Sequence, residues 1–535
     1  MTKTIKQEVP ATPPAATNKL APYLPGIVLF IVALAIGLLT YQDYGIGWDE
    51  PYQRAPTILT YDYMFHGSQE MFKKEEDNNH GAGFELVLLF IEKGLHLTDT
   101  RDIYFNRHIV THVFFLLCAF SGYVLVLRLF KDNRFLASLA FIIFAFTPRM
   151  YAHSFFNSKD VPFMCMILVT LAVSRAAFDK NKSWLYLVTG LACGYATSIR
   201  IMGVMVCGFL AMFLLIDLLA ALKKKENLMK PVLNMVSFVV GFCFSLYISW
   251  PYLWRHPIKN FISSFTNMSH YQWGATTLIG GKAIVATSLP WYYIPTWFWI
   301  TTPVLWLIAG LGAICWIIYE LSKSPAAYLQ NTRERNFVLY ILCFFVPVLS
   351  IIVLHSVVYD DWRHLYFIYP PFVLLALYLV DKGLHNKYKM VVQGLCALQV
   401  AMIGFFMVKN HPFHEVYFNE MVSHDDQYLR KNYEMDYWGN CYKQAFEHIM
   451  ENDNRKKIYV CSNLSAYVEN NLLILRPEDR VRFQFTPPDS ADYFITNYRG
   501  HPDDYTGANV YYDITVLNSS ILQIFRLKAT DVRLR

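Results

Sequence analysis

Two adjacent carboxylates, Asp49 and Glu50, follow the first long apolar stretch of the chain, which runs over 22–41. Carboxylates beside hydrocarbon cost free energy unless a cation, a proton or a substrate compensates them. Pro51 favours the first turn of a helix, so we expect both carboxylates at the positive N-terminal end of a short helix. That position stabilises the ionised form, which suits a proton-accepting base or a cation ligand.

A structural alternative exists for this pair, because Asp49 could cap a helix beside the membrane without taking part in any chemistry. Adjacent side chains point to different sides, so the two carboxylates cannot flank one bond as they do in a glycosidase. We therefore expect one carboxylate to react and the other to position it. Tyr52, in the same segment, is a candidate for substrate contact.

A second group of ionisable residues lies between two apolar stretches, in what the sequence predicts to be a short outer loop at 148–160. A salt-bridged loop in which Asp160 caps the next helix would explain the group in structural terms, and this can coexist with function. The candidates are Asp160 for catalysis, Arg149 and Lys159 for phosphate binding, and His153 and Asn157 for substrate binding.

Arg200 stands between two short apolar stretches and needs an anion. Its planar donor fork matches phosphate oxygens, so a lipid phosphate is one partner, while Asp49 or Asp160 could equally supply the charge. The segment 359–366 adds Arg363 and His364 to the phosphate-binding candidates.

Asp360 and Asp361 precede Arg363 in the same segment. Charged residues at the tip of an outer loop are usually solvated. We expect these two aspartates to be ordinary solvated loop residues.

The composition sets the class of protein that carries these groups. Of 535 residues, 55% are hydrophobic and only 16% are charged, which is far too apolar for an ordinary soluble protein. A span needs about 20 apolar residues, and about eleven stretches are candidates, of which 135–147 and 184–199 are short enough to be tilted or re-entrant segments. They are 22–41, 108–129, 135–147, 161–178, 184–199, 201–221, 232–250, 291–319, 337–356, 365–380 and 389–408.

Lysine and arginine are concentrated in alternate connections, which predicts their side of the membrane to be the cytoplasm. The amino terminus then lies in the cytoplasm and is predicted to be retained as part of an uncleaved anchor. The cytoplasmic lysines account for the net charge of +6, so no nucleic acid partner is expected. The outer face receives 42–107, 148–160, 251–290, 357–364 and everything after 409.

Three regions are expected along the chain. Residues 1–20 are a disordered cytoplasmic segment, 21–408 form a transmembrane catalytic module, and 409–535 form a small extracytoplasmic α/β domain. An apolar segment too short to cross the bilayer, 84–95, predicts an amphipathic helix along the interface. In the last region the pattern predicts a helix at 440–451, strands at 457–462, 482–486 and 492–497, and a hairpin at 509–527.

Cysteine and metal signals are weak. Eight of the ten cysteines lie in apolar spans and are expected to behave as small hydrophobic residues. Cys441 and Cys461 lie outside the cytoplasm and could pair or stay as free thiols. No metal-ligand spacing occurs in the sequence, so we expect a metal-independent enzyme without a cofactor, with Glu50 and Asp160 as the remaining option for a divalent ion.

At these residues, over roughly 22–380, the chain resembles the GT-C superfamily of polyprenyl-phosphate-sugar-dependent glycosyltransferases. It is most similar to glycosyltransferase family 39, the protein O-mannosyltransferases and aminoarabinose transferases. An Asp-Glu pair in the first outer loop supplies that family's catalytic carboxylate, and Asp49-Glu50 matches it in position and order. Asp160 matches a second acidic residue in the next outer loop.

The resemblance implies an all-α polytopic fold in a bacterial inner membrane. It further implies a polyprenyl-phosphate sugar donor and a protein or glycan acceptor, with inversion at the anomeric carbon. Asp49 would remove the proton of the acceptor hydroxyl, while Arg200 and Arg363 stabilise charge on the departing lipid phosphate.

Three other classes are open from the sequence. One is an enzyme of the O-antigen polymerase or ligase type, whose site would rest on arginines and a histidine of a large outer loop. A second is a polytopic lipid or solute transporter, which would carry charges within several spans. The third class is a non-catalytic assembly subunit, in which residues 409–535 would bind partners or the acceptor. The sequence leaves the oligomeric state open.

Overall fold

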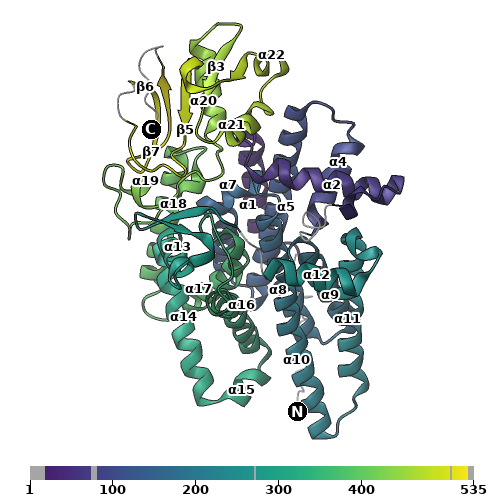
Figure 1. Ribbon diagram of the computed structural model, residues 1–535. Helices are drawn as coiled ribbons and strands as arrows, with labels where there is room; N and C mark the ends of the chain where they lie inside the picture. The colour runs from purple at the N-terminus through teal and green to yellow at the C-terminus, as the bar shows by residue number, and fades with distance from the viewer. Residues whose placement is uncertain (1–18, 74–80, 270–272, 506–508, 528–535) are drawn as a thin grey trace, which may run out of the picture.

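The computed structural model describes residues 19–73, 81–269, 273–505 and 509–527. Residues 1–18 of the predicted cytoplasmic segment lie outside this part of the chain. Long helices form the main body, and Figure 1 shows a small β-containing part at one end of it. The predicted class, an all-α polytopic membrane protein with a small C-terminal α/β part, is confirmed.

The first half of the chain is helical. Its helices are α1 (Leu24–Thr40), α2 (Asp49–His66), η1 (Glu70–Lys73), α4 (Gly83–Gly94), α5 (Thr100–Leu129), α6 (Arg134–Phe146), α7 (Pro148–Phe156), α8 (Asp160–Lys180), α9 (Ser183–Ile199), α10 (Gly203–Lys224), α11 (Met229–Ser249), η2 (Pro251–Trp254) and α12 (Pro257–Ser269). Figure 1 shows α2 and α4 lying across the end of the bundle that also carries the C-terminal strands. Helix α4 coincides within one residue with the predicted amphipathic segment.

After a hairpin of β1 (Thr276–Ile279) and β2 (Lys282–Val285), further helices complete the bundle. They are η3 (Ala286–Ser288), α13 (Tyr293–Thr301), α14 (Val304–Lys323), α15 (Pro325–Gln330), α16 (Thr332–Leu354), η4 (Arg363–Ile368), α17 (Tyr369–Leu384) and α18 (Lys389–Lys409). The predicted stretch 291–319 is divided into α13 and α14, because Pro303 interrupts the helix.

Within the described ranges, eight helices are long and apolar enough to cross a membrane, and α6 with α7 forms a pair bent by 55° that adds a ninth. This count is lower than the expected eleven, because α1 and α9 have only 17 residues each. The spans identify a multi-pass integral membrane protein.

The predicted outer loop at 148–160 is wrong in its main part, because residues 148–156 form helix α7. Pro148 occupies the first turn, a position that favours helix, and all nine residues of α7 are buried. The helix packs against α5 and η5 (His414–Val416). Burial of its apolar side chains holds this segment inside the protein.

The C-terminal part is built on a five-stranded sheet with the order β4-β3-β5-β7-β6. Its elements are α19 (Tyr428–Asn432), α20 (Tyr442–Asn452), β3 (Ile458–Cys461), α21 (Ser465–Leu472), α22 (Pro477–Arg480), β4 (Phe483–Phe485), η6 (Pro488–Ser490), β5 (Tyr493–Thr496), β6 (Asn509–Val516) and β7 (Ser519–Arg526). Strand β3 runs parallel to β4 and β5, while β7 is antiparallel to β5 and β6.

The predicted strands and hairpin are confirmed to within one or two residues. Leu517 and Asn518 form the hairpin turn, both with positive φ (50° and 57°), as a two-residue turn between twisted strands requires. Cys441 and Cys461 are buried free thiols.

Helices α9 and α11 approach each other through glycines. A Cβ at Gly194 would lie 2.3 Å from the carbonyl oxygen of Phe242, and one at Gly241 would lie 2.2 Å from that of Leu187. Small residues of this kind let membrane helices pack backbone to backbone. The contact fixes the end of α9, where Arg200 follows.

We expect Gly194→Val to destabilise the protein, since the added side chain must push α11 away from α9. Overpacking costs about 1–3 kcal/mol, which corresponds to a fall in Tm of several degrees for a large domain. Thermal unfolding in detergent measures the effect. Gly208→Val in α10 is the matched control, because a Cβ there meets nothing within 4 Å; equal Tm values for the two variants would contradict the prediction.

Candidate active site

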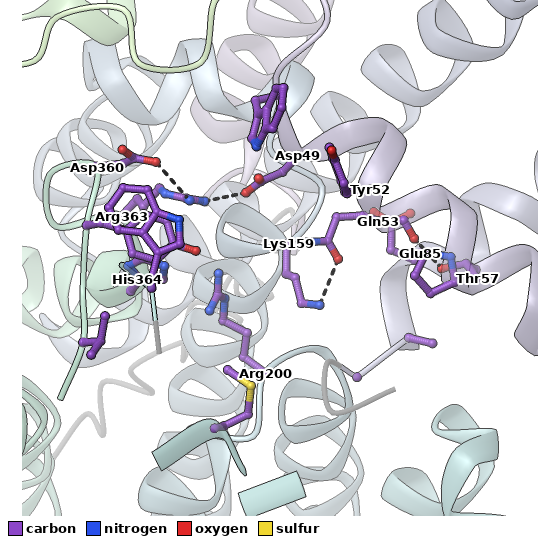
Figure 2. A pocket seen from close by; sticks show the side chains of 18 of the residues that line it. Asp49, Tyr52, Gln53, Thr57, Glu85, Lys159, Arg200, Asp360, Arg363 and His364 are labelled. Atoms are coloured by element: carbon purple, nitrogen blue, oxygen red, sulfur yellow. Dashed lines mark hydrogen bonds and ion pairs between the residues drawn. The ribbon is translucent and has the colours of Figure 1, made fainter. Parts of the chain in front are cut away.

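A cavity of about 440 Å³ lies at the end of the bundle next to the C-terminal region, by which we mean residues 410 onward. Its wall is formed by α2, the start of α4, Lys159, Arg200, η2, the segment 357–364 and two residues of the C-terminal region. Figure 2 shows Arg200 and Lys159 pointing into the space below Asp49, with Arg363 and Asp360 on one side and Gln53 and Glu85 on the other.

Asp49 and Glu50 are the first two residues of α2 and therefore lie at its positive end. Asp49 lines the cavity and accepts a hydrogen bond from Arg363 Nη1 at 2.7 Å. Glu50 is buried; its Oε1 accepts from the backbone N–H of Gly47 at 2.9 Å and lies 3.2 Å from His108 Nε2. The side chains diverge, as expected for neighbours, and Asp49 does not cap the helix.

Arg363 is buried among three carboxylates. Besides Asp49, its guanidinium lies 3.3 Å from Asp360 and 3.6 Å from Asp160. Arg200 forms an ion pair with Asp160. The sequence left a lipid phosphate, Asp49 and Asp160 open as the anion for Arg200, and in the structure Asp160 is the partner. A charged group at this depth is tolerated because it is paired and hydrogen-bonded.

Asp160 is the first residue of α8 and does not cap it. Asn157 satisfies the helix end instead, since its Oδ1 accepts the backbone N–H of Asp160 at 2.9 Å. Asn157 also donates to the Asp160 carboxylate at 3.0 Å. The carboxylate is thereby held toward Arg200 and Arg363.

Lys159 differs from the other cations of the cavity. Its side chain is 5% exposed, and Nζ donates to Gln53 Oε1 at 3.0 Å. No carboxylate of the described chain lies within ion-pair distance of this ammonium group. Burial, followed by the neighbouring Arg200, lowers the pKa of Lys159 to about 7, although Glu85, Asp160 and Asp49 act in the opposite direction. A buried cation without a matched anion favours an anionic ligand.

Of the predicted site residues, Asp49, Tyr52, Lys159, Arg200, Arg363 and His364 line the cavity. Five others do not. Glu50 and Asp160 are buried and are bound by neighbouring side chains. Arg149, His153 and Asn157 belong to α7 and its C-terminal turn, which are packed into the core. Arg149 is buried against the carboxylate of Asp361 at 2.8 Å, and His153 contacts Asn157 at 3.1 Å. The geometry thus separates Arg149, His153 and Asn157 from direct contact with a ligand in this cavity.

The expectation for Asp360 and Asp361 is wrong, since both are buried. Their φ values of 56° and 62° turn the backbone so that the carboxylates point inward. Asp361 accepts hydrogen bonds from Tyr366 and Tyr437 at 2.9 and 2.7 Å. Burial nevertheless raises the pKa of Asp361 to about 6. The polar character of this segment predicts solvent exposure, because the local sequence does not show the cations that distant segments place beside these two carboxylates.

Sequence reasoning also missed several residues of the cavity wall. Glu85 lies in the predicted amphipathic segment 84–95 and is not among the predicted site residues. It binds Arg107 at 2.8 Å and accepts a hydrogen bond from Ser158. Tyr467 and Arg499 come from the C-terminal region, where the sequence offers no motif that would single them out. For Glu85 alone a sequence signal exists that could have identified it, because an acidic residue within an apolar helix marks a candidate functional residue.

The residues considered for a divalent ion each have protein partners. Glu50 is bound to Gly47 and contacts His108, while Asp160 is bound to arginines. Across the part of the chain that the structure describes, no group of three metal-ligating side chains occurs.

Comparison with known proteins agrees with the sequence resemblance. Residues 82–257 match the family described as dolichyl-phosphate-mannose-protein mannosyltransferase. The matched segment carries Lys159, Asp160 and Arg200, whereas Asp49 lies before it. A comparison with curated proteins found no match.

Two solved structures illustrate the fold similarity. The chain is similar to the Archaeoglobus fulgidus oligosaccharyltransferase tethered with an acceptor peptide, with 10% identity and a TM-score of 0.46 over 86% of this chain and 64% of that one. It is also similar to ArnT from Cupriavidus metallidurans bound to undecaprenyl phosphate, with 12% identity and a TM-score of 0.42 over 85% of this chain and 76% of that one. The chain thus spans less than two thirds of the archaeal enzyme's length.

The family match confirms the predicted resemblance to the protein mannosyltransferase family over a third of the chain. The matched family is one of mannosyltransferases, the class of enzyme that the sequence predicts.

Lys159 yields a prediction about stability. A lysine whose pKa falls from 10.5 to about 7 on folding binds fewer protons in the folded state between these values, so its presence destabilises the protein most below pH 7 and least above pH 10. We expect Lys159→Met to raise the Tm by a few degrees at pH 6, with the gain shrinking as the pH rises toward 10. Thermal unfolding in detergent at several pH values measures this. The exposed Lys457→Met is the control and should change the Tm little. A gain for Lys159→Met that stays constant with pH would refute the prediction.

Proposed function

We propose that the protein moves a sugar from a polyprenyl-phosphate-linked donor to a hydroxyl of a protein or glycan acceptor, with Asp49 as the base. One observation carries the proposal. A half-buried carboxylate at the positive end of α2 shares a cavity with Arg200 and with Lys159, a buried cation that has no carboxylate partner among the described residues. A base and a phosphate-binding pair in one space are what such a transfer requires.

The donor assignment follows from the charge of the cavity. Arg200 offers a planar fork of donors, and Lys159 has N–H groups beyond the one bonded to Gln53. The matched family is described by a polyprenyl-phosphate sugar, dolichyl-phosphate mannose. A donor of this type is a phosphodiester with one fixed negative charge, which would occupy the space in front of Lys159 and Arg200.

The reaction we propose is a single displacement with inversion. The acceptor oxygen forms a bond to the anomeric carbon while the bond from that carbon to the phosphate oxygen breaks, and Asp49 takes the hydroxyl proton. The electron pair of the broken bond leaves on the polyprenyl phosphate, where Lys159 and Arg200 stabilise it. His364, on the cavity wall, is a further candidate for this phosphate contact.

In this scheme Arg363 orients the base and does not bind the donor phosphate directly. Its guanidinium is already surrounded by Asp49, Asp160 and Asp360. In that position it holds the carboxylate of the base in one orientation. Tyr52 is 60% exposed at the mouth of the cavity and is suited to contact the acceptor.

We place the protein in a bacterial inner membrane, with the amino terminus in the cytoplasm and the cavity on the outer face. The lysine and arginine distribution of the connecting segments supports this orientation. Mass spectrometry of lipid-linked sugars and surface glycans in a deletion strain would identify the donor, which should accumulate, and the acceptor, which should lose its sugar.

Asp49→Asn tests the base. Removing one positioned base costs about 10² to 10⁴ in rate, so the purified variant in detergent should show a loss of that size in sugar transfer. Its folding and its affinity for the donor should be retained. Asp62→Asn on the same helix is the control, since that carboxylate pairs with His66 on the exposed surface. Near wild-type turnover of Asp49→Asn would disprove the assignment.

Arg200→Ala tests the phosphate site. A lost hydrogen bond between charged groups costs about 1.5–3 kcal/mol, so we expect the donor KM to rise by roughly 10- to 100-fold, measured with a short-chain polyprenyl-phosphate sugar. Arg200→Lys should recover part of the affinity. Arg255→Ala, an exposed arginine outside the cavity wall, is the control. An unchanged donor KM in Arg200→Ala would remove Arg200 from the phosphate site.

A further inference from the structure

The backbone that leads into Asp49 is held by the C-terminal region. The side chain of Asn471, which is fully buried in α21, accepts the N–H of Ile46 at 2.9 Å and donates to the Ile46 carbonyl at 3.2 Å. The same amide donates to the carbonyl of Gly439 at 2.9 Å. One side chain therefore joins the segment before α2 to the C-terminal region as a strand partner would.

Close packing reinforces this contact. A Cβ at Gly45 would lie 2.4 Å from the Asn440 carbonyl oxygen and 2.4 Å from Asn471 Oδ1, so only glycine fits there. The N–H of Trp48 donates to the Trp438 carbonyl at 3.1 Å. The Trp48 ring also stacks on Tyr467 of α21, with centroids 3.9 Å apart.

A second connection reaches Asp49 through charges. Arg499 of the C-terminal region donates to Asp360 at 2.7 Å and to the carbonyl of Tyr437 at 2.6 Å. Asp360 binds Arg363 at 3.3 Å, and Arg363 binds Asp49 at 2.7 Å. The side chains of Arg499, Asp360 and Arg363 are buried, where ionic interactions are strong.

We propose that the C-terminal region is part of the active site and positions the base, with Asn471 and Arg499 as positioning residues for Asp49. The inference rests on the proposed function, because it assigns these residues to the same reaction. Asn471 fixes the backbone at the start of α2, and Arg499 fixes the partner of the Asp49 carboxylate. Neither residue needs to contact the donor phosphate to do so.

The physical reason lies in the sharing of Arg363. With Arg499 in place, Asp360 has a cation of its own. Without it, the buried charge of Asp360 is left to Arg363 and competes with Asp49 for the same guanidinium. Asp49 would then lose its orientation toward the acceptor, and a misplacement of about 1 Å can cost on the order of 10² in rate.

Transfer kinetics of Arg499→Met and Asn471→Ala in the full-length protein test the inference. We expect kcat to fall roughly 10- to 100-fold, while the donor KM and the affinity for undecaprenyl phosphate stay within about twofold of wild type. Arg499→Lys, which keeps the charge, should recover part of kcat. A purely structural role would instead lower Tm and donor affinity together with kcat.

Arg430→Met is the matched control. Arg430 is also a buried arginine of the C-terminal region with an aspartate partner, Asp504, but it does not line the cavity. Its variant should keep wild-type kcat.

Wild-type kcat in Arg499→Met overturns the inference, as does a loss of kcat matched by an equal loss of donor affinity. If Arg499→Met does not fold, Asn471→Ala and Arg499→Lys decide in the same way. Asp49→Asn is measured in parallel: full activity of that variant overturns the proposed function, whereas its inactivity beside fully active Arg499→Met overturns only the positioning by the C-terminal region.

Discussion

The buried guanidinium of Arg363 is the interaction on which the arrangement of the site depends. Three carboxylates surround it, and each comes from a different part of the chain: Asp49 from α2, Asp160 from α8 and Asp360 from the turn before η4. A single buried cation would be costly, and three carboxylates without a cation would repel one another. The elements are therefore stable in this arrangement only together, which ties the start of α2 to the starts of two membrane spans.

Charge alternates outward from that centre. Asp160 also pairs with Arg200, and Asp360 also pairs with Arg499, so three arginines balance three aspartates. Lys159 adjoins this set without a carboxylate partner in the described parts of the chain, and Glu85 already pairs with Arg107. In its protonated form Lys159 thus gives the cavity one uncompensated positive charge, which an anionic ligand with a single charge neutralises.

Local patterns in the sequence were sufficient for some of this structure. Pro51 and the apolar run before it predicted the helix start that carries Asp49 and Glu50, and alternation predicted the strands of the C-terminal sheet. Hydropathy failed where polar residues are buried by distant partners. The sequence of α7 predicts a loop because Arg149 and His153 are polar, although the Arg149 side chain is neutralised by Asp361. Asn471 and Arg499 belong to no motif, since Ile46 lies 425 residues from Asn471 in the sequence and Asp360 lies 139 residues from Arg499.

The distribution of burial among the spans explains why the site is located where it is. Helix α8 and the η4–α17 span are each 78% buried over their apolar windows, whereas α10, α11 and α18 are between 22% and 28% buried and face lipid along most of their length. Asp160 is the first residue of α8, and Arg363 is the first residue of η4. The central ion pairs thus begin the two most enclosed spans, which neighbouring helices hold on all sides, and reactive groups need such rigid support to keep sub-ångström geometry.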